Sequence, residues 1–218
     1  MIALPEAPPR IAKLPRNHAG YPVPWFVAVI NGVPDFRIVR ENGIQDAVRF
    51  RMCWLCGGPL GANATFVIGP MCSINRVSPE PPSHRDCADY AARACPFLTR
   101  PEMRRRSSNL PDDTSDPDGI MIARNPGVAL VWTSRTWRLD QRHRLFDVGD
   151  PADVRWYAEG RAATRAEVLA SIESGLPLLR AEAENDPQRA LALAALDRMH
   201  ADALTLVPGE DHTPEVVQ

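Results

Sequence analysis

Four side chains with metal-binding chemistry lie close together in the middle of the sequence. Two residues separate Cys53 from Cys56, which Gly57 follows, and His84 and Cys87 repeat the spacing further on. Structural zinc sites use thiolate sulfur and imidazole nitrogen, and a Cys-x-x-Cys turn commonly supplies two of the four ligands. Clustered cysteines in a reducing compartment favour metal over disulfides. The spacing therefore predicts one zinc ion held by Cys53, Cys56, His84 and Cys87.

Two other cysteines leave this ligand set open. Cys72 lies between the two pairs and could replace His84, and Cys95 follows Cys87 by about two helical turns. Free cysteines often behave as small buried hydrophobic side chains. We therefore expect His84 in the set, and we keep Cys72 as the alternative metal ligand.

The order of local structure resembles a treble-clef zinc finger over about residues 51–96. A knuckle at Cys53 and Cys56 leads into a predicted hairpin that begins at Ala64. A predicted helix then starts at Pro81–Ser83 and carries the last two ligands on one face. The resemblance implies that the metal joins the knuckle to the helix.

The enzymes with this finger are HNH-type nucleases, so the resemblance makes a metal-dependent nuclease an alternative function. Those enzymes place a histidine base on the hairpin, but residues Phe66 to Val77 contain no histidine. Four protein ligands also leave no position for the water that catalytic zinc holds. We therefore assign no catalytic residue and lean toward a protein that is not an enzyme. A nuclease would have to use His143, which stands between Arg142 and Arg144.

The flanking segments predict an α+β fold with a mostly antiparallel sheet. Two strand-like runs within residues 24–39 are joined by Asn31-Gly32, a strong hairpin signal because both central residues of the favoured turn need positive φ. Further strands are expected at 120–123, 128–133 and 136–148. We expect these runs to form one sheet, with the treble-clef-like zinc module inserted into it.

Helical signals dominate the C-terminal part of the sequence. They are a helix start at Asp150-Pro151, a capping box at 164–167, a helix end at Gly175 and Pro177, and a second helix at 187–205. Together with a short helix expected at 43–51, the signals divide the chain into parts. These are an extended N-terminal arm at 1–20, a sheet domain at 21–150 with the zinc module at 51–98, a helical region at 151–206 and a tail at 207–218.

The charges are unevenly distributed along the chain. Residues 49–106 hold nine arginines against four acids, a net charge of +5, whereas residues 151–218 hold six arginines against twelve acids, a net charge of −6. Basic clusters can neutralise phosphates. The candidates for binding nucleic acid or a partner are Arg85, Arg93, Arg100, Arg104, Arg105 and Arg106. Alternatively, these arginines dock the acidic helices of the same chain or of a partner.

The composition and three local runs bear on the source of the protein. All but one of the 25 basic residues are arginine, which is typical of GC-rich coding, and Lys13 is the single lysine. The runs Trp54–Gly58, Val67–Cys72 and Pro82–Cys87 resemble uncharacterised proteins of actinobacteria and their phages. The resemblance implies an origin and a zinc site, and it implies no activity.

Taken together, these observations predict a zinc-binding, non-catalytic interaction protein of phage or phage-like origin. It would bind a host protein or nucleic acid, with a nucleic-acid-binding regulator as a further alternative; the oligomeric state is left open. No apolar run reaches the roughly 18 residues of a membrane span. Prolines also interrupt the first 20 residues, where a signal peptide needs an apolar core. We therefore expect a cytoplasmic protein with no membrane contact.

Overall fold

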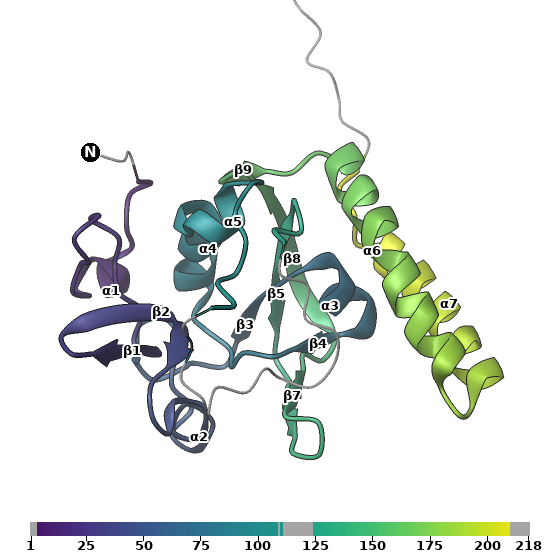
Figure 1. Ribbon diagram of the computed structural model, residues 1–218, viewed down its shortest axis with the longest axis horizontal. Coiled ribbons are helices and arrows are strands. Elements are labelled where there is room, and N and C mark those ends of the chain that lie inside the picture. The colour runs from purple at the N-terminus through teal and green to yellow at the C-terminus, as the bar shows by residue number, and fades with distance from the viewer. Residues whose placement is uncertain (1–3, 109, 111–123, 210–218) are drawn as a thin grey trace, which may run out of the picture.

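The computed structural model describes residues 4–108, 110 and 124–209 of the 218-residue chain. Its helices and antiparallel sheets make it an α+β protein (Figure 1). The elements in chain order are α1 (Pro9–Ala12), β1 (Val27–Ile30), β2 (Val33–Val39), α2 (Gly43–Arg49), β3 (Ala64–Ile68), α3 (Pro70–Asn75), β4 (Val77–Ser78), α4 (Arg85–Ala94), α5 (Pro96–Thr99), β5 (Ala129–Ser134), β6 (Arg138–Asp140), β7 (Leu145–Asp147), β8 (Pro151–Ala158), β9 (Arg161–Ala162), α6 (Arg165–Asn185) and α7 (Arg189–Leu204). Among the described helices, none combines the length and the apolar character that crossing a membrane requires.

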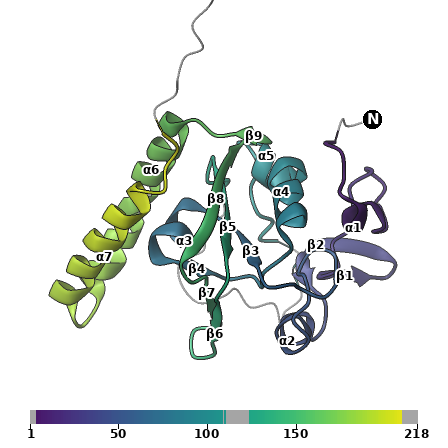
Figure 2. The same ribbon diagram turned by 180° about the vertical axis from the view of Figure 1, so that it is seen from behind.

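The central sheet has the strand order β3-β5-β8-β9 and is antiparallel throughout. Helix α4 covers one face, and α3, α6 and α7 lie on the other side (Figures 1 and 2). Every residue of β5 is buried because both faces of this strand are covered. Successive side chains alternate between the faces, so Leu130 and Trp132 join one core while Val131 joins the other.

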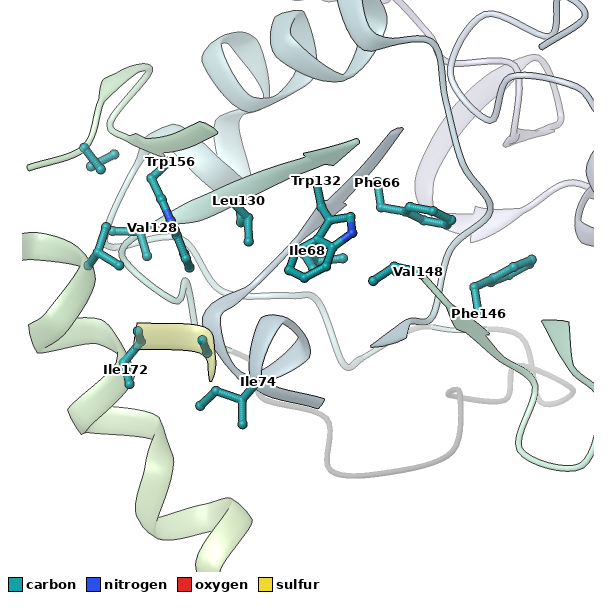
Figure 3. Close-up of a cluster of buried hydrophobic side chains, with 14 of the residues drawn as sticks. Phe66, Ile68, Ile74, Val128, Leu130, Trp132, Phe146, Val148, Trp156 and Ile172 are labelled. Atoms are coloured by element: carbon teal, nitrogen blue, oxygen red, sulfur yellow. The ribbon is translucent and has the colours of Figure 1, made fainter. Parts of the chain in front are cut away.

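The larger core fills the space between the sheet and the helices α3 and α6 (Figure 3). Trp132 lies fully buried at its centre, with Phe66 and Ile68 from β3 beside it. Ile172 comes from α6 and Ile74 from α3. Burying one such side chain stabilises the fold by about 1.5–3 kcal/mol, so this cluster is the main source of stability for the scaffold.

The opposite face of the sheet fixes helix α4. Ala88 and Ala92 are fully or almost fully buried against Val131, and their small side chains let the helix approach the sheet closely. Charged and polar contacts on β8 add to this packing. Arg85 pairs with Asp153 at 2.6 Å, Arg155 pairs with Asp89 at 3.1 Å, and the Tyr157 hydroxyl donates a hydrogen bond to Asp89 at 2.9 Å. The first turn of α4, which carries two candidate metal ligands, therefore has a fixed position on the sheet.

The hairpin at 24–39 is confirmed, but the single sheet is wrong. In the described part of the chain, strands β1 and β2 pair only with each other, with Asn31 and Gly32 both at positive φ in the turn. Strands β6 and β7 form a third sheet with β4. The sequence pattern identifies strands but carries no information on which strands pair. The strand expected at 120–123 lies outside the described residues.

Two C-terminal boundaries also differ from expectation. Asp150-Pro151 starts the strand β8 instead of a helix, since a proline is also tolerated as the first residue of a strand. Helix α6 continues through Gly175 and Pro177 to Asn185. At Gly175 an added Cβ would lie 2.6 Å from the Met71 sulfur, so the glycine serves close packing of α6 on α3 and does not end the helix. The capping box at Thr164 and Glu167 and the helix at 187–205 are confirmed.

Replacing Thr164 with alanine removes the side chain that accepts a hydrogen bond from the Glu167 N–H at 3.2 Å. We expect the free energy of unfolding to fall by about 0.5–2 kcal/mol, the usual value of such a cap. Chemical denaturation at pH 7 measures the change. Thr164→Ser keeps the hydroxyl and should stay within about 0.5 kcal/mol of the wild type; equal losses in both variants would contradict the cap.

Acid should weaken the same cap over a defined pH range. The Arg161 guanidinium and the Thr164 N–H hold the pKa of Glu167 at about 2, below its ordinary value of 4.5. The ionised carboxylate therefore stabilises the folded state fully above about pH 4.5, and this contribution is lost as the pH falls toward 2. The stability difference between wild type and Glu167→Gln, measured by denaturation at several pH values, should shrink through that window. A difference that does not change with pH would contradict this.

Candidate metal centre

A tight turn at residues 52–59 presents the first two sulfurs. The Cys53 N–H donates to the Gly58 carbonyl at 2.7 Å, and the Gly57 N–H donates to the Cys53 carbonyl at 2.8 Å. Gly57 has φ +72°, which side chains rarely permit, and an added Cβ would meet the Trp25 ring at 2.5 Å. Both the turn and the packing of Trp25 therefore require glycine here.

The other two ligand residues lie at the N-terminus of α4. His84 is the N-cap residue and Cys87 lies in the first turn, so the helix starts later than the predicted Pro81–Ser83. Thr65 and Ser83 exchange two backbone hydrogen bonds at 3.0 and 2.7 Å, which attach the segment before α4 to strand β3. The positive end of a helix dipole favours a thiolate at this position.

The four side chains converge on one point. The ligand atoms of Cys53, Cys56, His84 and Cys87 all lie within 4.8 Å of one another, so the cluster could hold a metal ion. The Nδ1 atom of His84 is 3.3 Å from the Cys56 sulfur and 3.9 Å from the Cys87 sulfur. A tetrahedral ion with Zn–S and Zn–N bonds of ordinary length would place sulfur and nitrogen about 3.5 Å apart. The observed spacing fits such an ion.

The imidazole of His84 is oriented for binding through Nδ1. Its Nε2 atom lies 2.9 Å from the Pro59 carbonyl oxygen, which can only accept a hydrogen bond. The proton therefore belongs on Nε2, and the lone pair on Nδ1 points at the sulfurs. Metal-bound histidines usually have such a second hydrogen bond, which sets their tautomer and orientation.

The electrostatics of the sulfurs require a cation before all three can ionise. Hydrogen bonds from the Cys87 thiol and from the backbone N–H groups of Cys56 and His84 lower the pKa of Cys53 to about 4. The hydrogen bond to Cys53 and burial raise the pKa of Cys87, and burial raises that of Cys56. Without a cation, the hydrogen bond with Cys53 thus favours the protonated form of Cys87, and burial favours the protonated form of Cys56. A divalent ion reverses this preference by binding all three thiolates.

The N-terminal segment covers this cluster. The expected extended arm is wrong for the described residues, because Pro9–Ala12 form the short helix α1. Ile11 is buried against Cys53, Cys87 and Tyr90, with Leu14 packed beside it. Arg10 pairs with Asp86 at 3.2 Å. No local pattern predicts this contact, since a proline-rich polar segment is equally compatible with a free arm.

The remaining predicted features lie elsewhere. Cys72 is in α3 and packs against the large core, where burial raises its pKa to about 11. Cys95 lies between α4 and α5. The hairpin predicted from Ala64 onwards is wrong, because β3 pairs with β5, and α3 follows β3 directly. His143 lies in the turn between β6 and β7, outside the metal cluster and not on a strand as expected.

The six candidate arginines are mostly engaged with groups of the same chain. Arg93 and Arg104 are exposed. The contacts of the other four are Arg85 with Asp153 at 2.6 Å, Arg106 with Asp35 at 2.6 Å, Arg100 with the Tyr21 hydroxyl at 3.3 Å, and Arg105 with the Phe97 ring at 5.2 Å. Part of the basic charge is thus balanced within the chain.

Comparison with known proteins gave no match: no protein family, no curated protein and no solved structure is similar to this chain.

Gly57→Ala should damage the turn that carries Cys53 and Cys56. We expect a loss of about 1–3 kcal/mol in the free energy of unfolding, because the backbone is strained and the Trp25 ring is displaced. Thermal and chemical denaturation measure it. Gly61→Ala is the matched control, since an added Cβ there meets nothing within 4 Å and its φ is ordinary. Equal stability of the two variants would contradict this account of the turn.

Proposed function

We propose that the chain binds one structural zinc ion through Cys53, Cys56, His84 and Cys87 and acts as a non-catalytic interaction protein. The observation that supports this proposal is the convergence of three sulfurs and one correctly oriented imidazole nitrogen within 4.8 Å. Two of the sulfur residues, Cys53 and Cys87, are fully buried. A buried cluster of thiolates without a cation would be destabilised by desolvation and by repulsion between like charges.

Zinc is the metal that best suits these donors. Thiolates are soft ligands that select Cu(I), zinc or iron–sulfur clusters, whereas calcium and magnesium need oxygen ligands. A Cys₃His set in tetrahedral arrangement is one of the ordinary structural zinc sites. All four positions would be filled by protein atoms, which leaves none for the water of a catalytic zinc.

The ion would reinforce a junction that already has hydrogen bonds, such as the one from the Trp54 backbone N–H to the Pro82 carbonyl at 3.0 Å. It would connect the 52–59 turn to the N-terminus of α4. The 52–59 turn also supports the β1–β2 hairpin. Phe26 stacks on Trp54 with ring centroids 4.6 Å apart, and the Trp25 backbone N–H donates to the Leu55 carbonyl at 2.8 Å. A knuckle and a helix that share one metal are the defining parts of a treble clef, so this interpretation stays part of the proposal. The position of the usual hairpin is taken here by strand β3, to which Ser83 is hydrogen-bonded.

The proposed partner is a host protein or nucleic acid, bound through the surface of the zinc module, and the proposed origin is a phage or phage-like element. The resemblance to actinobacterial and actinophage proteins supports the origin. The intrachain ion pairs of Arg85 and Arg106 favour a protein partner over nucleic acid, since arginines already paired with carboxylates neutralise phosphates less effectively.

Purified protein should contain about one zinc per chain by elemental analysis. His84→Ala should lower zinc affinity by more than about 100-fold, because it removes a ligand rather than only its support. His84→Cys restores a four-ligand set and should keep the metal. A competition titration with a chromophoric chelator measures the affinities.

Cys72→Ser is the control that separates the two ligand sets. It should keep one zinc per chain with affinity within about tenfold of the wild type, since Cys72 packs in the core. Loss of zinc in Cys72→Ser but not in His84→Ala would show that Cys72 is the ligand. Protein that is folded and free of metal after mild purification would overturn the proposal.

Binding and cleavage assays test the alternatives. The proposal expects no divalent-metal-dependent cleavage of plasmid or RNA, and only weak, salt-sensitive binding of nucleic acid, with dissociation constants of about 10⁻⁴–10⁻⁶ M. Cleavage abolished by His143→Ala would establish the nuclease. Tight binding that is lost on replacing Arg104, Arg105 and Arg106 with alanine would establish the nucleic-acid-binding regulator.

A further inference from the structure

The β1–β2 hairpin carries most of the exposed large apolar side chains in the described part of the chain. Val29 and Val33 are each 61 % exposed. The others on the hairpin are Ile30, Phe36 and Val39, with Phe50 exposed just after α2. Contiguous exposed apolar side chains mark interaction surfaces, whereas single ones are ordinary. The hairpin therefore has the composition of an interface.

The two edges of this hairpin differ in their ability to pair with another strand. Pro34 lies on β2 and has no N–H to donate, which blocks that edge. Val29 is opposite Pro34, one pair away from the turn. In an antiparallel hairpin with a two-residue turn, this second pair directs its N–H and C=O groups away from the partner strand. Within the described residues, β1 pairs with β2 alone, and no backbone–backbone hydrogen bond outside that ladder involves Val29. In this part of the chain, the outer edge of β1 is therefore unpaired.

A groove runs beside the open edge, between β1 and α2. Its volume is about 690 Å³, and Ala28 and Val29 form its β1 side. Its charged lining consists of two arginines and two acids, namely Arg40, Arg49, Glu41 and Asp46. In the described parts of the chain, none of the four forms an ion pair; the two arginines instead lie over the rings of Trp25 and Phe50 at 4.6 and 5.2 Å.

We propose that the occupant of this surface is a second copy of the chain, which pairs antiparallel with β1 around a two-fold axis near Val29. A two-fold interface uses the same patch on both subunits, so the patch must be complementary to itself. A lining with two positive and two negative side chains meets this condition. The four charges of this lining sum to zero, so the groove does not attract nucleic acid or strongly acidic or basic peptides. Pairing would satisfy the open backbone groups and cover Val29 and Ile30.

The resulting assembly is a four-stranded antiparallel sheet in the order β2-β1-β1-β2. Both β2 strands become its outer edges, where Pro34 prevents further addition. The interface therefore closes at two copies and does not extend into a fibre. The contacts of this dimer come from β1 and the groove beside it, and none of the four candidate metal ligands takes part in them.

Sedimentation velocity of the full-length protein, from about 1 µM to about 200 µM, should show a concentration-dependent dimer. Val29→Lys places two like charges beside the axis and should raise the dimer dissociation constant at least about tenfold. Val29→Pro removes the edge N–H and should do the same. Leu191→Lys is the matched control, because Leu191 is 68 % exposed on α7, at the opposite side of the molecule from the hairpin (Figures 1 and 2). It should leave the dissociation constant unchanged.

A charge-reversal pair identifies the partner as a second copy. Arg40→Glu/Arg49→Glu and Glu41→Arg/Asp46→Arg should each be monomeric, and an equimolar mixture should form a heterodimer. Circular dichroism and thermal unfolding verify that each variant is folded. A wild-type protein that stays monomeric over the whole range overturns the proposal. So does a dimer that Val29→Lys and Leu191→Lys weaken equally, or a mixture of folded charge-reversal variants that remains monomeric.

Discussion

Three sulfur atoms in one buried site can be negatively charged together only if a cation lies among them. Much of the local structure supplies what such an ion needs. The 52–59 turn places two sulfurs, the N-terminus of α4 places the third, and the Pro59 carbonyl sets the tautomer of His84. Ile11 of α1 then packs over Cys53 and Cys87. Each of these contacts is weak alone, and a bound ion would make them act together.

The site is also mechanically connected to two distant parts of the molecule. On one side, Ala88 and Ala92 of α4 pack on the central sheet, whose core is the most deeply buried region. On the other side, Trp54 next to the first ligand supports the hairpin through Phe26. A bound ion would thus lie between a rigid scaffold and a surface element with little core of its own. Loss of metal would be felt first in the orientation of the hairpin.

The sequence was informative where local chemistry decides the structure. The spacing of Cys53, Cys56, His84 and Cys87 predicted side chains that do converge, and Asn31-Gly32 predicted a turn that forms. Strand pairing and the strand at Asp150-Pro151 could not be predicted, because they depend on which surfaces far apart in the chain meet. Gly175 and Pro177 look like a helix end, yet packing on α3 and α7 overrides them. The packing of Ile11 against Cys53 and Cys87 could not be predicted either, because no local sequence pattern indicates it.

The strand order β3-β5-β8 has a consequence for how the protein is made. Both ligand pairs leave the ribosome before β5 and β8 have been synthesised, so β3 is the only strand of the sheet under α4 that exists when the last ligand, Cys87, emerges. Contacts between segments so far apart in sequence form late and slowly. An ion captured early by the four ligands would close a loop of the nascent chain and hold α4 near β3. The metal would then guide the order of folding during translation as well as the finished structure.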